Sequence, residues 1–334
     1  MRTSTPARAL GAALLLAAVA AGCDFTPTLD VETPAFVPGV ALRGFLVADS
    51  VAVLDVDQAW SPYEGYPQDG PVYGRATVIT ILRDGAVVER ITERRDRCVD
   101  LGQPPVPPGG EIETYPCGPY AGTVPIEAGA TYTLQVEAEG LPPAEATVSV
   151  PRRPTLEVTE EEGSLGERRF RVRITDPAGA GDRYGFAFLR TYTYTTVSCA
   201  PQQECVETTE TRRYPLYFET SDPVLLSAAA EIDGDIAFVT FTDETFDGQT
   251  KTFTASASRA YPGKEPRDTV TVQLAALSGD VYDTYRIEYF SGGDDNPFAE
   301  PINLPSNVEG GYGLVGGLTL AEVTFETPEG AARQ

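Results

Sequence analysis

The stretch Thr131-Tyr-Thr-Leu-Gln-Val-Glu-Ala138 alternates apolar and polar residues, and this pattern indicates how the chain folds. Every second residue from Tyr132 to Ala138 is apolar, so these side chains share one face of an extended strand. Arg169-Phe-Arg-Val-Arg-Ile-Thr175 and Thr269-Val-Thr-Val-Gln-Leu274 repeat the alternation. Half-polar strands of this kind belong to antiparallel sheets that keep one face in water. The sequence therefore predicts an all-β protein.

Turn residues and prolines divide this β pattern into two parts. Asp84-Gly85 separates two apolar runs and predicts a tight hairpin. About seven short strands are expected between Val40 and Val150, the number typical of an immunoglobulin-like sandwich. Pro151-Arg-Arg-Pro154 then interrupts the alternation. We predict an N-terminal immunoglobulin-like sandwich over residues 39–152 and a second antiparallel β domain over residues 153–334. One short helix is expected at Ser278–Phe290, where apolar residues recur at near-helical spacing: Val281, Tyr285 and Tyr289.

The N-terminus has the features of a lipoprotein signal peptide. Arg2 and Arg8 carry positive charge, an Ala- and Leu-rich apolar run follows, and small residues come directly before Cys23. Residues 1–22 are therefore expected to be removed and Cys23 to carry the lipid, with palmitate among its acyl chains. An ordinary signal peptide followed by an incidental thiol is the alternative. Residues 23–38 contain three prolines and no helical periodicity, so they are expected to form a lipidated tether.

Charge and composition exclude several classes of protein. The formal net charge is −24, which argues against binding nucleic acid because such proteins need a cationic surface. The chain has no histidine, which removes Ser-His-Asp and Cys-His catalysis and histidine-ligated metal sites. We therefore expect a non-enzymatic protein without a cofactor. Glycoside hydrolysis by paired carboxylates stays open as an alternative.

The cysteines after Cys23 are even in number, as expected for disulfides in an exported chain. Pairs that stay within one predicted domain are Cys98–Cys117 and Cys199–Cys205. Their spacing does not match paired Cys-x-x-Cys metal knuckles, and no histidine could complete such a site. We predict two disulfides.

Two further groups of residues suggest ligand binding. Four aromatic residues fall in one Pro- and Gly-rich segment that could stack against sugars or peptides: Trp60, Tyr63, Tyr66 and Tyr73. The alternative is that Trp60 closes a strand into the core and the tyrosines pack the loop down. Three acidic clusters could bind Ca²⁺ but are also typical of turns: Asp233-Gly-Asp235, Asp243-Glu244 with Asp247, and Asp294-Asp295-Asn296. Asp294, Asp295 and Asn296 are the foremost Ca²⁺ candidates.

The C-terminal part of the chain resembles a known family. The segments Asn296-Pro-Phe-Ala-Glu-Pro301 and Leu304-Pro-Ser-Asn-Val-Glu-Gly-Gly311, followed by Gly313 and Gly316, are similar to the closing motif of domain-of-unknown-function family 4249. The resemblance implies a lipoprotein of the outer membrane of Bacteroidota, often encoded near TonB-dependent receptors. It carries over no catalytic residue.

Together these observations predict a lipid-anchored, non-enzymatic accessory or binding lipoprotein that partners a TonB-dependent transporter. A structural component of envelope assembly and a surface glycan- or peptide-processing enzyme are the alternatives. The sequence does not choose between the periplasmic and the surface-facing side of the outer membrane.

Overall fold

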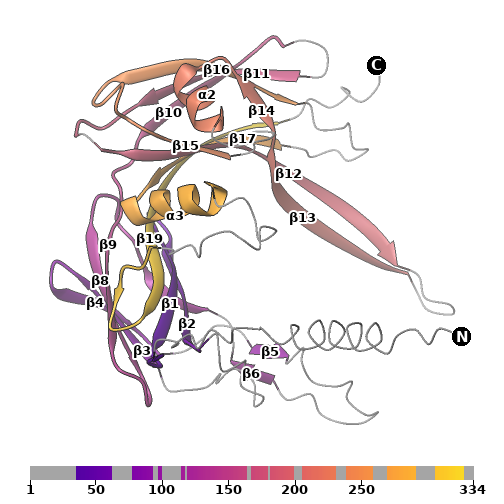
Figure 1. The fold of residues 1–334 in the computed structure, drawn as a ribbon. Coiled ribbons are helices and arrows are strands. Elements are labelled where there is room, and N and C mark those ends of the chain that lie inside the picture. The colour runs from indigo at the N-terminus through magenta and orange to yellow at the C-terminus, as the bar shows by residue number, and fades with distance from the viewer. Residues whose placement is uncertain are drawn as a thin grey trace, which may run out of the picture. The chain divides into compact units, whose positions relative to one another are not determined.

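The computed structural model describes residues 35–61, 77–92, 97–99, 114–116, 119–163, 167–179, 181–198, 205–230, 238–258, 269–290 and 305–326. Their strands and helices all lie in Pro38–Gln334, which groups as one unit. Within the described residues there are four β-sheets and two helices (Figure 1), so the predicted all-β class is confirmed. Neither helix has the length and apolar character needed to cross a membrane.

A five-stranded sheet and one end of an eight-stranded sheet form the N-terminal sandwich. The five-stranded sheet has the order β18 (Val308–Glu309), β9 (Ala144–Ser149), β8 (Thr131–Ala138), β3 (Thr77–Arg83) and β4 (Ala86–Ile91). The strands of the eight-stranded sheet that share its core are β1 (Val40–Val47), β2 (Val51–Gln58) and β7 (Tyr120–Pro125). A separate antiparallel pair consists of β5 (Arg97–Val99) and β6 (Thr114–Pro116).

The expected pattern of burial and turns is present in this sandwich. Tyr132, Leu134 and Val136 of β8 are buried in the core, as their alternation predicts. The hairpin between β3 and β4 turns at Asp84 and Gly85, whose φ angles of 51° and 78° are both left-handed. Asp and Gly tolerate this conformation at little cost, which is why their sequence predicts the turn.

The other end of the eight-stranded sheet packs on a four-stranded sheet. At this end, the strands of the eight-stranded sheet are β13 (Val206–Leu216), β12 (Arg183–Ser198), β17 (Thr269–Leu277) and β15 (Phe238–Thr242). The four-stranded sheet has the order β10 (Thr155–Glu161), β11 (Glu167–Thr175), β16 (Thr250–Ser258) and β14 (Phe218–Thr220). Aromatic rings dominate the core between them. The ring of Phe186 lies 5.3 Å from those of Phe218 and Phe253, in edge-to-face geometry that favours aromatic pairs.

The last strand, β19 (Tyr312–Glu326), joins the two ends of the eight-stranded sheet. It pairs in parallel with β1 and antiparallel with β17. The N-terminal core consequently includes Val308 and Val315 from the C-terminal segment. The two cores otherwise divide close to Pro151, and a boundary between independent domains at residues 152/153 stays a prediction.

Glycines let β19 run close to its neighbours. Gly313 has a φ of 107°, a conformation that side chains disfavour. A Cβ on Gly317 would meet the carbonyl oxygen of Ser149 in β9. The strand begins at Tyr312, within this glycine-rich stretch.

The two helices give one confirmed and one missed prediction. Helix α3 (Gly279–Phe290) matches the expected segment, and its Val281 and Tyr282 pack on Ala275 and Leu277 of β17. Because α3 packs here, β17 is buried on both faces. The prediction that one face of this strand lies in water was therefore wrong. Helix α2 (Pro223–Ala230) was not predicted from the sequence.

Candidate functional site

Most of the residues that the sequence singles out lie outside the described part of the chain. These are Cys23, Cys117, Cys199, Tyr63, Tyr66, Tyr73, Asp233, Asp235, Asp294, Asp295 and Asn296. Trp60 follows β2 and is half-buried. The aromatic loop and the Ca²⁺ site at residues 294–296 stay predictions.

Two of the predicted disulfide cysteines fall in described segments. Cys98 lies opposite Tyr115 in the β5–β6 pair, and Tyr115 is two positions along the chain from Cys117. Cys205 is disulfide-bonded. The pairings Cys98–Cys117 and Cys199–Cys205 remain predictions.

The strands β12 and β13 extend beyond the rest of their sheet as a two-stranded ribbon (Figure 1). Residues 183–191 of β12 pair with β17, whereas residues 192–198 pair with β13 alone among the described strands. Strand β13 is also the edge of the eight-stranded sheet. Among the described strands, the ribbon thus presents two side-chain faces and a backbone edge without a partner strand.

Threonines hold the ribbon together on one face. The hydroxyl groups of Thr193 and Thr211 lie 2.9 Å apart, and those of Thr195 and Thr209 lie 3.1 Å apart. Cross-strand pairs of this kind each stabilise a sheet by roughly 0.2–1 kcal/mol. Val197 is 53% exposed, so the ribbon also offers apolar surface near its tip.

Three aspartates from three strand ends meet at one point of the second sandwich. Asp176 follows β11, Asp182 precedes β12, and Asp243 follows β15. Because Arg183 of β12 pairs with Thr242 of β15, the residues next to them come together. One oxygen atom from each carboxylate lies within 4.8 Å of the other two. We call these three residues the aspartate cluster.

The loop between β11 and β12 and the loop between β15 and β16 are joined by hydrogen bonds from backbone amides to aspartate side chains. Gly179 and Gly181 donate to Asp247 Oδ1 at 2.9 Å and Asp243 Oδ1 at 3.1 Å. In the opposite direction, Gly248 donates its amide to Asp176 Oδ2 at 2.7 Å. The hydroxyl of Tyr184 donates to the other oxygen of Asp176. These bonds hold the carboxylates in place without neutralising them.

Burial makes the charge of the aspartate cluster costly. Asp176 and Asp243 are 4% and 1% exposed. The pKa of Asp182 is raised, mainly by burial and to a smaller extent by the neighbouring carboxylate of Asp176. Two such charges at this separation repel by about 3 kcal/mol at an effective dielectric constant of roughly 20. Arg152 forms an ion pair with the aspartate cluster, and its Nη2 lies 3.6 Å from Asp182 Oδ2.

Sequence reasoning weighed Asp243, with Glu244 and Asp247, as a Ca²⁺ ligand or a turn residue, and missed Asp176 and Asp182. Asp243 does begin a turn, because Phe246 donates its amide to the Asp243 carbonyl at 2.7 Å. The available signal was the segment Asp176-Pro-Ala-Gly-Ala-Gly-Asp182, which places one acidic residue at each end of a loop between two strands.

A family model for a domain of unknown function, DUF4249, matches residues 25–323. The chain belongs to this family. The family model thus confirms the resemblance found in the C-terminal motif. No curated protein matches the chain.

Solved structures give weak similarities to this DUF4249 chain. The full-length major pilin SpaD of Corynebacterium diphtheriae aligns at 12% identity and a TM-score of 0.22, over 71% of this chain and 61% of the pilin. The native conformation of alpha-2-macroglobulin from E. coli aligns at 10% identity and a TM-score of 0.23, over 87% of this chain and 16% of the macroglobulin. The chain spans less than two thirds of either protein, and neither similarity carries an argument about its function.

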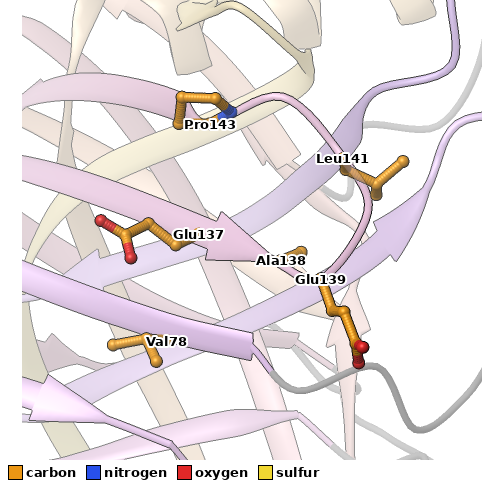
Figure 2. Close-up of a pocket in the computed structure, with 6 residues that line it drawn as sticks. All are labelled: Val78, Glu137, Ala138, Glu139, Leu141 and Pro143. Carbon is orange, nitrogen blue, oxygen red and sulfur yellow. The ribbon is translucent and has the colours of Figure 1, made fainter.

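An open pocket lies at the turn between β8 and β9 of the DUF4249 chain. It is lined by Val78, Glu137, Ala138, Glu139, Leu141 and Pro143. Figure 2 shows that the carboxylates of Glu137 and Glu139 point away from each other. A carboxylate pair for acid–base catalysis must face one substrate bond, so this pocket does not supply one.

Proposed function

We propose that this DUF4249 protein is a lipid-anchored, non-enzymatic binding lipoprotein of the outer membrane, and that it contacts a TonB-dependent β-barrel transporter. The signal peptide and Cys23 support the anchor, with palmitate among the acyl chains. The family resemblance supports the outer-membrane location and the class of partner. A lipid anchor confines the protein to two dimensions and raises its effective concentration near membrane partners.

The observation that carries a binding role is the β12–β13 ribbon. An isolated two-stranded ribbon is only marginally stable in water, and this one extends past the support of β17. Polar cross-strand pairs and a disulfide at Cys205 stabilise it instead of a core. A stabilised ribbon with an open edge loses little conformational entropy when a partner binds, and the edge can pair with a strand of that partner.

The arrangement of acidic side chains supports the non-enzymatic part of the proposal. Asp176 and Asp243 are close enough for a carboxylate pair, but both are almost fully buried and accept backbone amides. A substrate could not reach them without opening the loops. The exposed pair Glu137 and Glu139 diverges (Figure 2).

Affinity purification from native membranes tests the proposal. We expect a β-barrel transporter to co-purify reproducibly with the wild-type protein. A variant in which a short Asn-Gly turn replaces residues 193–211 should lose the barrel while keeping its circular dichroism spectrum. Truncation of Ser61–Val72 serves as the matched control, because it removes a different loop and leaves the ribbon intact.

Two outcomes would contradict the proposal. Reproducible recovery of other proteins without any barrel would remove the transporter as the partner. Loss of the barrel in the Ser61–Val72 variant alone would place the contact on the N-terminal sandwich and remove the ribbon from it.

A further inference from the structure

We infer that Asp176, Asp182 and Asp243 form a Ca²⁺ site at the loops that join β11 to β12 and β15 to β16. The inference concerns the second sandwich and does not depend on the proposed transporter. It begins with the geometry of the aspartate cluster. Ligand oxygens around one Ca²⁺ lie roughly 2.3–2.6 Å from the ion, so two of them can be at most about 5 Å apart. One oxygen of each aspartate meets this condition, since all three lie within 4.8 Å of one another.

The second observation is a buried carboxylate oxygen that has no donor. Asp243 is 1% exposed, and its Oδ1 accepts the amide of Gly181, yet its Oδ2 has no hydrogen-bond partner. Asp182 Oδ2 is likewise buried without a hydrogen bond. Buried polar atoms in native proteins are nearly always satisfied, and an unsatisfied charged oxygen is especially costly. A cation within the aspartate cluster would satisfy both oxygens at once.

The chemistry of the ligands favours Ca²⁺. The aspartate cluster supplies only hard carboxylate oxygens, and the chain contains no histidine that could complete a site for zinc. Ca²⁺ accepts several carboxylates in flexible geometry, whereas Mg²⁺ requires a near-ideal octahedron and keeps most of its waters. The backbone amides from Gly179, Gly181 and Gly248 hold the loops in position, so the ligands are arranged before the ion arrives.

Neutralisation by Arg152 is the competing explanation. Its Nη2 lies 3.6 Å from Asp182 Oδ2, which is an ion pair beyond hydrogen-bond distance, and its side chain is 51% exposed. One half-exposed guanidinium at one edge of the aspartate cluster leaves Asp243 Oδ2 unsatisfied. The two explanations differ in what removal of Arg152 does. If the arginine merely competes with the ion, removal of Arg152 should strengthen Ca²⁺ binding.

Calorimetric titration of the full-length protein in detergent, stripped with a chelator, tests the site with CaCl₂ as the probe. We expect one Ca²⁺ per chain and a thermal midpoint that rises on adding CaCl₂ and falls again with chelator. Asp243→Asn keeps the oxygen that accepts the Gly181 amide but removes the charge, and should weaken binding by about tenfold or more. Glu244→Gln is the matched control, because this exposed neighbour carries the same charge outside the aspartate cluster, and it should bind like wild type.

Several results would overturn the inference. These are no heat of binding with wild-type protein, equal affinity in Asp243→Asn and Glu244→Gln, or tighter binding of MgCl₂ or MnCl₂ than of CaCl₂. If Asp243→Asn does not fold, Asp182→Asn gives the same test at the more exposed edge of the aspartate cluster. Arg152→Ala should bind Ca²⁺ more tightly than wild type, and lost binding in that variant would also count against the site.

Discussion

Lys251 Nζ lies 2.7 Å from Asp222 Oδ2, and the two side chains are only 12% and 7% exposed. The other oxygen of Asp222 accepts the amides of Val224 at 3.0 Å and Leu225 at 3.1 Å. One carboxylate therefore caps helix α2 and also pairs with a lysine on β16. This relationship explains why the helix starts at Pro223, since Asp is a preferred cap and Pro is favoured directly after it.

Asp222→Ala should be strongly destabilising. It removes the cap and leaves Lys251 buried without its partner, a change that typically costs about 3–5 kcal/mol. Urea denaturation would measure the free energy of unfolding. Lys251→Met is the matched variant, because Asp222 then keeps two amide donors and the favourable end of the helix dipole. A loss in Lys251→Met as large as that in Asp222→Ala would contradict this account.

Gly317→Ala should also destabilise the protein, for a steric reason. The added Cβ would meet the backbone carbonyl of Ser149, which cannot move without shifting β9. Overpacking of this kind costs about 1–3 kcal/mol. Gly85→Asn is the control, because no atom lies within 4 Å of a Cβ there and Asn tolerates the left-handed turn. Thermal denaturation of both variants should show a lower midpoint only for Gly317→Ala.

The four cysteines after the lipidation site should be oxidised in two local pairs. Peptide mapping under non-reducing conditions should recover Cys98 with Cys117 and Cys199 with Cys205. Closing the larger loop contributes about 3 kcal/mol in the chain-entropy model, so reduction should lower the thermal midpoint. A Cys117–Cys199 link would contradict both pairings.

The mature protein should partition into detergent and begin with an acylated Cys23. Mass spectrometry of the N-terminal peptide would show the mass of the lipid. Cys23→Ser should release the protein from the membrane fraction, because it removes the thiol that the lipid anchor requires. An unmodified N-terminus, or a Cys23→Ser protein that stays equally membrane-bound, would disprove lipidation.

Local features of the fold were predictable from the sequence because their causes are local. Alternation at Thr131–Ala138 predicted β8 to the residue, and Asp84-Gly85 predicted the turn between β3 and β4, since strand period and turn preference depend on adjacent residues. The same reasoning failed for β17. Its polar Thr271 is only 4% exposed, and Ala275 and Leu277 on the same face of the strand pack against α3.

The sequence by itself thus determined the all-β class, the alternating strands such as Thr131–Ala138, the Asp84-Gly85 turn, the helix expected at Ser278–Phe290 and the family. Only the tertiary structure decided that β19 pairs with both β1 and β17, and that Asp176, Asp182 and Asp243 meet. The physical reason is that strand order follows from packing between segments far apart in the chain. Residues at the ends of three such strands become neighbours only when that order is set.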